Sequence, residues 1–131
     1  MPFGETTSPE IERVATAIVD SCFVVHKRFG PGLLESVYKA FLAAELRKRG
    51  FTVLREIKVP IYYDDVEIEE GFRLDLLVND LVIVEVKAVE KMIPVFNAQI
   101  LTHLKLTSKR LGFLVNFNVL LIKDGIKRIV N

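Results

Sequence analysis

The sequence RLDLLV at residues 73–78 is followed, after three residues, by VIVEVK at residues 82–87. Both stretches are rich in Val, Leu and Ile, which is typical of strands in a sheet that is covered on both faces. Asp75, Glu85 and Lys87 interrupt this apolar pattern. Because burying an unpaired charge costs several kcal/mol, these three side chains need either one another or a ligand.

The spacing of these residues decides whether they can form one site. Glu85 and Lys87 are two residues apart on one strand, so they project from the same face. A strict two-residue turn at residues 79–80 would pair Asp75 with Val84 and direct it to the opposite face. A three-residue or bulged connection instead pairs Asp75 with Glu85. The second register also aligns the apolar residues of both strands on the other face. We predict this register, because only it brings the three polar groups together.

Two neighbouring carboxylates repel each other, and a hard divalent cation would relieve that repulsion. Oxygen ligands without cysteine or clustered histidine favour Mg²⁺ or Mn²⁺ over Zn²⁺. A lysine beside such an ion can orient an attacking water or stabilise developing phosphate charge, so the pattern outlines a phosphodiester-hydrolysis site. An Asp75–Lys87 or Glu85–Lys87 ion pair without metal explains the same spacing, and spacing alone leaves both interpretations open.

The hydrophobic pattern changes period along the chain, from helical to strand-like and back. The first helix is expected to begin near Ser8-Pro9 and to end at Gly30. The expected order ααββββαβββ predicts a single α/β (α+β) domain over residues 1–131, with a central mixed sheet flanked by helices. The other expected elements are helices at residues 33–49 and 97–108 and strands at residues 55–63, 66–69, 72–78, 81–88, 112–117, 119–122 and 126–130.

Composition restricts the class of protein. The 131 residues carry 18 basic and 17 acidic side chains, which argues against a histone-like coat of positive charge but allows a local phosphate-binding patch. A lone cysteine, Cys22, cannot form an internal disulfide. The sequence also shows neither a secretory signal pattern nor an apolar run long enough to span a bilayer. We therefore expect a soluble, cytoplasmic protein without membrane contacts.

The run GLLESVY at residues 32–38 matches the motif that names the GxxExxY family. The chain resembles this family, a branch of the PD-(D/E)xK nuclease-like superfamily, over nearly its whole length. The resemblance implies a restriction-endonuclease-like fold with an acidic metal site at one edge of the sheet. It also extends through His26, GPG at residues 30–32, Val59-Pro60, FRLD at 72–75, VEVKA at 84–88, Ala98-Gln99, LGFLVNF at 111–117 and DGIKR at 124–128.

The resemblance also assigns roles to individual residues. Carried over by position, Asp75 and Glu85 would bind the metal ion and Lys87 would be the catalytic lysine. Glu35 would supply a further carboxylate to the metal and to the reaction. Gln99 would assist from the helix that follows the lysine strand, although it could equally cap local backbone groups. The implied cofactor is Mg²⁺ or Mn²⁺.

Two positions, one on that helix and one just before it, depart from the resemblance. His103 stands four residues after Gln99, where the resemblance leads us to expect a tyrosine. A metal ligand, a phosphate contact and a surface residue all remain open for it. Phe96 stands where a more polar residue is expected. Both departures concern substrate contacts more than metal binding.

Other candidate residues have ordinary structural interpretations as well. Tyr38 is expected to be a core residue, or one whose hydroxyl orients a carboxylate. For His26 we favour packing over ligation. Arg73 could contact phosphate or, as we favour, neutralise the acids. Glu56 could be an acid that supports the site or, as we favour, a charge at the sheet edge.

Together these expectations describe a metal-dependent nuclease-like protein that hydrolyses nucleic-acid phosphodiester bonds, with DNA favoured over RNA. Basic groups at residues 47–49, 105–110 and 123–128 could contact phosphates, or could simply be solvated helix ends and turns. The alternative is a non-catalytic binding or assembly module that keeps the nuclease fold. In either case the small size and near-neutral charge suit a homo-oligomer or a subunit bound to a partner.

Overall fold

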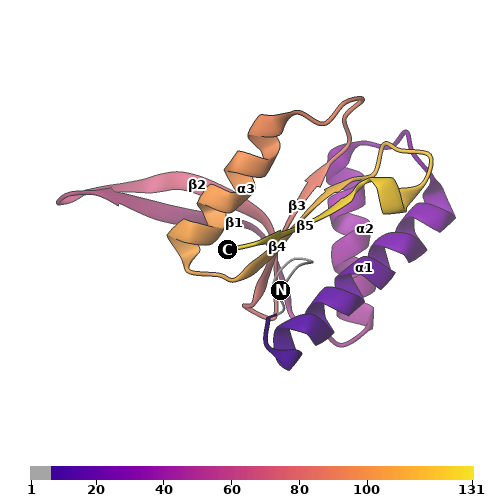
Figure 1. The fold of residues 1–131 in the computed structure, drawn as a ribbon, viewed down its shortest axis with the longest axis horizontal. Helices are drawn as coiled ribbons and strands as arrows, with labels where there is room; N and C mark the ends of the chain where they lie inside the picture. The colour runs from indigo at the N-terminus through magenta and orange to yellow at the C-terminus, as the bar shows by residue number, and fades with distance from the viewer. Residues whose placement is uncertain (1–6) are drawn as a thin grey trace.

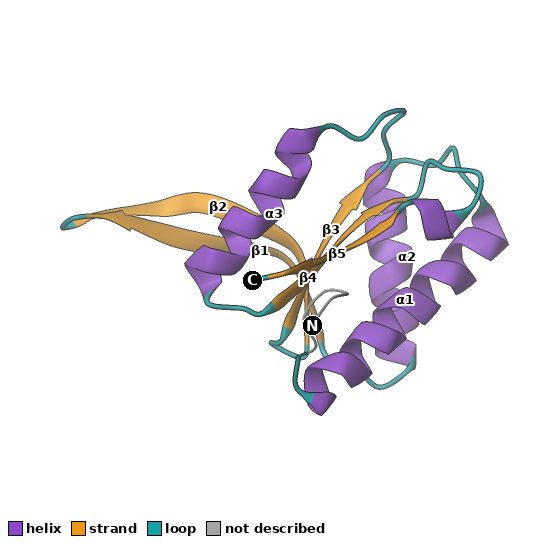
Figure 2. Cartoon of the chain, in the orientation of Figure 1, coloured by secondary structure: helices purple, strands orange, loops and turns teal. Residues whose placement is uncertain are grey.

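Five strands form one mixed sheet with helices on both faces in the computed structural model, which describes residues 7–131 (Figure 1). Helices α1 and α2 lie on one side of the sheet and α3 lies on the other (Figure 2). The predicted fold class is therefore confirmed. The elements are α1 Pro9–Phe29, α2 Glu35–Lys48, β1 Val53–Tyr63, β2 Val66–Val78, β3 Val82–Lys87, α3 Pro94–Thr107, β4 Leu111–Asn116, the 3₁₀ helix η1 Ile122–Asp124 and β5 Ile126–Val130.

Helix α1 begins and ends where the sequence predicts. The Ser8 side chain accepts a hydrogen bond from the amide of Ile11 at 3.2 Å, and Pro9 occupies the first turn. The helix ends at Phe29, where Gly30 has a φ of 68° that favours glycine. No helix in the described part of the chain is both long and apolar enough to cross a membrane.

The strands follow one another across the sheet in chain order, and only β3 and β4 run parallel. Helix α3 makes the crossover between those two strands. Its Ile100 packs closely on Gly112 of β4, where an added Cβ would lie 3.0 Å from the Ile100 side chain. Strands β3 and β4 are buried along almost their whole length, as expected for the centre of a covered sheet.

The hydrophobic core has a larger and a smaller part. The larger part lies between the sheet and helices α1 and α2, and the smaller part lies between the sheet and α3. Val84 belongs to the first and Ile83 to the second, so neighbouring residues of β3 serve opposite faces. Both faces of the sheet are therefore closed by helices.

The prediction of two separate strands at residues 66–69 and 72–78 is wrong. Strand β2 is continuous over 13 residues and pairs with β1 along its length. A Cβ at Gly71 would lie 2.2 Å from the Ile61 side chain, and the β1–β2 register shifts at Ile61. Gly71 thus allows a close crossing at a bulge and does not end the strand. The outer half of this hairpin, residues 60–70, projects beyond the helices as an arm (Figure 1).

The strand predicted at residues 119–122 is also wrong. Residues 117–125 form the connection between β4 and β5, and they contain η1. The Asn116 amide donates to the Gly125 carbonyl at 2.8 Å, and the His26 ring bonds the Val119 carbonyl at 2.7 Å. Leu120 is 89% exposed. The apolar segment is thus held as a loop against α1, because no strand is available to pair with it.

Helix α3 begins three residues earlier than predicted, at Pro94. Pro94 occupies the first turn, where a missing amide hydrogen costs nothing, so it starts the helix rather than interrupting the chain. Residues 7–131 thus contain three α-helices, five strands and one 3₁₀ helix, with the site residues at the junction of β2, β3, α2 and α3.

Candidate functional site

Strands β2 and β3 pair in the register that brings the candidate acids together. Leu76 lies opposite Val84, and residues 79–81 connect the two strands. The pairing ends there, one residue short of Asp75 and Glu85, whose carboxyl groups interact directly with each other. The predicted three-residue connection is confirmed, and the strict two-residue turn is excluded.

Asp75 lies where β2 begins to separate from β3. The paired register ends at the preceding step, and the Asp75 carboxylate takes the position of the next backbone partner. Its Oδ2 accepts a hydrogen bond from the amide of Val86 at 2.9 Å, and its Oδ1 lies 3.5 Å from the ammonium of Lys39. One oxygen is thus fixed by the backbone of β3 and the other faces α2.

Glu85 is almost fully buried, with 8% of its surface exposed. Burial raises the pKa of its carboxyl to about 7; the hydrogen bond with His103 opposes that rise, and the neighbouring Asp75 adds to it. The Nδ1 atom of His103 lies 3.1 Å from Glu85 Oε1, and its ring stacks on Phe72 at 4.5 Å between centroids. His103 is therefore a partner of Glu85 that is held in place by an aromatic ring.

Lys87 is on the same face of β3 as Glu85, as its spacing predicts. Its ammonium lies 4.4 Å from the centre of the Phe96 ring on α3. Within residues 7–131, Lys87 forms no ion pair with Asp75 or Glu85. The simple ion-pair interpretation of the motif is therefore wrong for both acids. Phe96, unexpected from the resemblance, is the residue that holds this lysine.

Lys39 was not recognised in the sequence as part of the site. It is buried on α2, and its ammonium lies 2.9 Å from Glu56, 3.5 Å from Asp75 and 3.7 Å from Glu35. Burial acts to lower the pKa of Lys39, but Glu56, Asp75 and Glu35 outweigh it and raise the pKa. Lys39 therefore stays charged and neutralises three carboxylates.

Glu56 has a larger role than a charge at the sheet edge. It lies opposite Asp75 in the β1–β2 register, with a φ of 53° that is uncommon for a residue other than glycine. Lys39 holds the pKa of Glu56 below its ordinary value. Arg73 also lies 3.0 Å from Glu56, so Arg73 neutralises this glutamate and not the two acids of the motif.

Tyr38 and Gln99 lie outside this network. The Tyr38 hydroxyl donates to the Gly30 carbonyl and accepts from the Leu33 amide, and its ring stacks on Phe117. It is a core residue that fixes the α1–α2 connection, and the idea that it orients a carboxylate is wrong. Gln99 lies exposed on α3, one turn before His103. His26 packs against the β4–β5 loop, as favoured.

This arrangement agrees with a comparison of the chain with protein families. Residues 12–129 match the sequence model of the PD-(D/E)XK nuclease superfamily, from α1 to β5. The chain belongs to the PD-(D/E)XK nuclease superfamily. Neither a curated protein nor a solved structure matches the chain. The superfamily supports a nuclease-like function in general and leaves the role of each residue to be tested.

The donors present suit the divalent ions that PD-(D/E)XK nucleases usually use, though they form no ready-made cage. Across residues 7–131, no three His, Cys, Asp or Glu side chains lie close enough together to hold an ion. Mg²⁺ commonly binds through one or two carboxylates and completes its shell with water and substrate phosphate. Asp75 and Glu85 meet that requirement, and burial of Glu85 without a cation of its own accounts for its raised pKa.

Many of the basic residues of this nuclease-superfamily chain are bound within the protein. Arg49 pairs with Glu45, Arg128 with Glu12 and Lys109 with Asp80. The Arg47 guanidinium donates to the carbonyl of Val53 at 2.6 Å, and that of Arg110 donates to the carbonyl of Asn131. Structural roles thus account for much of the charge at the three predicted basic groups.

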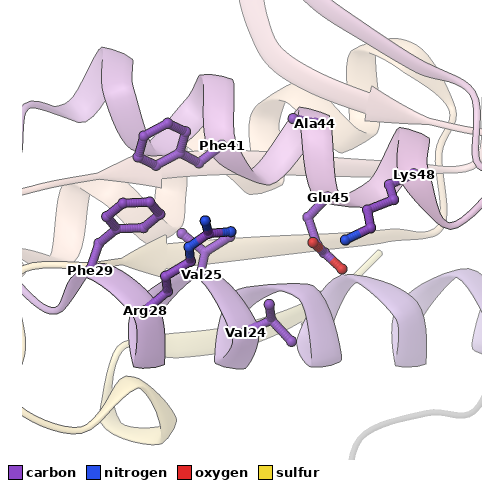
Figure 3. Close-up of a pocket in the computed structure, with 8 residues that line it drawn as sticks. All are labelled: Val24, Val25, Arg28, Phe29, Phe41, Ala44, Glu45 and Lys48. Atoms are coloured by element: carbon purple, nitrogen blue, oxygen red, sulfur yellow. The ribbon is translucent and has the colours of Figure 1, made fainter.

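A separate groove lies between α1 and α2 (Figure 3). The rings of Phe29 and Phe41 stack across it, 4.3 Å apart between centroids, and Arg28, Glu45 and Lys48 lie along it. None of the candidate site residues lines this groove. The nuclease-superfamily motif and the groove are therefore distinct surfaces.

Proposed function

We propose that this protein is a metal-dependent nuclease of the GxxExxY branch that hydrolyses nucleic-acid phosphodiester bonds. The observation that carries the proposal is the interaction of Asp75 with Glu85 where β2 and β3 separate, with Lys87 two residues further along β3. Burial and mutual repulsion make this pair of acids unfavourable alone, and a hard cation would relieve the cost.

Asp75 and Glu85, with the Val86 carbonyl and the adjacent Glu35, would hold Mg²⁺ or Mn²⁺. When bound, such an ion polarises the phosphoryl oxygen and lowers the pKa of a coordinated water. Glu35 begins α2 and lies 3.7 Å from Lys39, so it is near Asp75 through a shared partner. Its side chain is 42% exposed, which leaves it free to turn toward an ion or toward water.

Lys87 would position the attacking water or stabilise charge on the phosphate. For this it would leave the Phe96 ring, a contact worth about 0.5–2 kcal/mol, which substrate phosphate can replace. Gln99 lies exposed on the α3 face that also carries His103, and would contact the substrate or the water.

The substrate would be nucleic acid, DNA before RNA, bound through phosphates. The arm makes a poor binding surface for a polyanion, because residues 60–70 carry five acidic side chains and no Lys or Arg. The nucleic acid should therefore approach from the end of the sheet where β2 and β3 separate, between α2 and α3. A single domain, a cytoplasmic location and assembly with a second copy or a partner subunit belong to the same proposal.

A non-catalytic binding module is the second candidate. The observations that favour it are the contact of Lys87 with Phe96 and the neutralisation of Asp75 by Lys39, both of which stabilise the site without metal. Such a module would keep the nuclease fold for assembly alone, and would neither need the metal ion nor hydrolyse phosphodiesters.

Nuclease assays separate the two candidates. Wild-type protein is incubated with single- and double-stranded DNA and with RNA, in Mg²⁺, in Mn²⁺ and in EDTA. We expect metal-dependent cleavage that is lost in Lys87→Ala and retained in Lys27→Ala, an exposed lysine on α1. Circular dichroism and thermal melting check that each variant is folded. Wild-type protein that is folded and inert on every substrate with both ions would overturn the proposal.

A further inference from the structure

Lys39 occupies the centre of the acidic cluster, and the proposed reaction gives it no role. Its side chain is only 11% exposed, and it is the cation nearest to Asp75 among the ion pairs of the described residues. A buried lysine is retained only where carboxylates compensate its desolvation, and here three of them do so. Its position therefore has a specific electrostatic consequence.

The contacts of Lys39 are unequal. The shortest, 2.9 Å, is to Glu56, and the contacts to Asp75 and Glu35 are longer, at 3.5 and 3.7 Å. Glu56 is fixed by its unusual backbone and by Arg73. Lys39 thus has one firm partner outside the proposed metal ligands and two weaker contacts to those ligands.

Lys39 and an incoming metal ion would compete for the same oxygen of Asp75. Because the Val86 amide already holds Oδ2, the other oxygen, Oδ1, is the one that faces Lys39 and is open to further contacts. An ion that binds Oδ1 must share it with the ammonium or displace it. A metal ion on Oδ1 and the Lys39 ammonium would be neighbouring cations in a partly buried site, and they would repel each other strongly.

We infer that Lys39 is an internal counter-cation that competes with the divalent ion for Asp75 and sets the metal affinity of the site. Without metal, Lys39 neutralises the cluster and prevents repulsion among its acids. When an ion enters, Lys39 withdraws toward Glu56 and gives up Asp75 and Glu35. This inference rests on the proposed metal site, but concerns binding and not hydrolysis.

Metal titration of two variants tests the inference in opposite directions. Lys39→Gln removes the competing charge, so Mn²⁺ should bind at least about tenfold more tightly than to wild type. Glu56→Gln removes the firm partner, so Lys39 should stay on Asp75 and Mn²⁺ should bind several-fold more weakly. Lys39→Arg keeps the charge and should show no gain. Lys27→Gln, remote from the site, is the matched control.

Isothermal titration calorimetry with MnCl₂ on EDTA-stripped protein measures these affinities, with free Mn²⁺ followed by electron paramagnetic resonance. Equal affinity in wild type and folded Lys39→Gln would overturn the inference and leave the nuclease proposal intact. If Lys39→Gln does not fold, unchanged or tighter binding in Glu56→Gln overturns it instead. Tighter binding in Lys39→Gln without hydrolysis by any form would support the inference while the nuclease proposal fails. No Mn²⁺ binding by any form would overturn both.

Discussion

Replacing Glu85 by glutamine should stabilise the metal-free protein at high pH and not at low pH. Glutamine has nearly the same shape and can still hydrogen-bond His103, but it carries no charge. The native pKa of Glu85 is raised by burial from 4.5 to about 7. At about 1.4 kcal/mol per pKa unit, burying the charged form lowers the free energy of unfolding by about 3 kcal/mol.

The direction of the Glu85 pKa shift determines the pH range in which the stabilities of Glu85→Gln and wild type differ. Below pH 4.5 the carboxyl is protonated in both the folded and unfolded states, so the wild type has no electrostatic penalty. Between pH 4.5 and 7 the unfolded state loses its proton first, and wild-type stability falls as pH rises. Above pH 7 the penalty is complete. Glu85→Gln should therefore match wild type near pH 4.5 and exceed it by up to about 3 kcal/mol at pH 8.

Urea denaturation in EDTA at several pH values from 4.5 to 8 measures this difference. Glu90→Gln, an exposed glutamate in the β3–α3 loop, is the matched control and should not change stability with this pH profile. A constant difference between Glu85→Gln and wild type across the range would refute the reasoning. So would a Glu85→Gln protein that is less stable than wild type at pH 8, because the buried carboxylate would then be a favourable interaction.

Two further predictions concern residues outside the acidic cluster. Cys22 is fully buried, and burial raises its pKa to about 12. A thiol-specific reagent at pH 8 should therefore react with Cys22 only in urea. Rapid labelling of the native protein would contradict its buried position. Tyr38→Phe removes a hydroxyl that bonds two backbone groups of the α1–α2 connection, so the free energy of unfolding should fall by about 1–2 kcal/mol with the stacked ring retained. Equal urea midpoints for Tyr38→Phe and wild type would show that solvent replaces both hydrogen bonds.

The register of the site could be predicted because it is an apolar matching problem. Shifting β2 against β3 by one residue would move a whole set of valines and leucines from the core to the wrong face, at a cost far above that of a longer turn. Asp75 and Glu85 are brought together as a by-product of that packing. Helix α1 could be predicted for a different reason, because the residues that cap and end it are local signals in the sequence.

Lys39 and Glu56 could not be placed in this way, although the sequence held one signal. Lys39 lies in line with Leu42, Ala43 and Leu46 on the buried stripe of α2, where a charged residue needs a partner. The partner is distant in sequence, and it reaches Lys39 only through a backbone conformation at Glu56 that no local pattern predicts. Interactions that depend on an irregular φ angle are visible only once the tertiary structure is known.

The two incorrect strand predictions share a physical cause. Residues 119–122 are apolar enough for a strand, yet Leu120 and Leu121 are exposed because β4 and β5 already pair with each other. Gly71 resembles a break, yet it permits the tight crossing with Ile61 that keeps β2 continuous. Local composition indicates which segments could form strands, and the availability of a pairing partner determines which of them do.

The two acids of the site are supported from opposite faces of the sheet. Asp75 contacts Lys39 on α2, and Glu85 contacts His103 on α3, while these helices cover different faces (Figure 2). Each helix thus supplies one side chain that contacts one of the two acids. A divalent ion held by both Asp75 and Glu85 would link these two sets of contacts. Its binding should therefore couple α2 to α3 across the end of the sheet, where β2 and β3 separate.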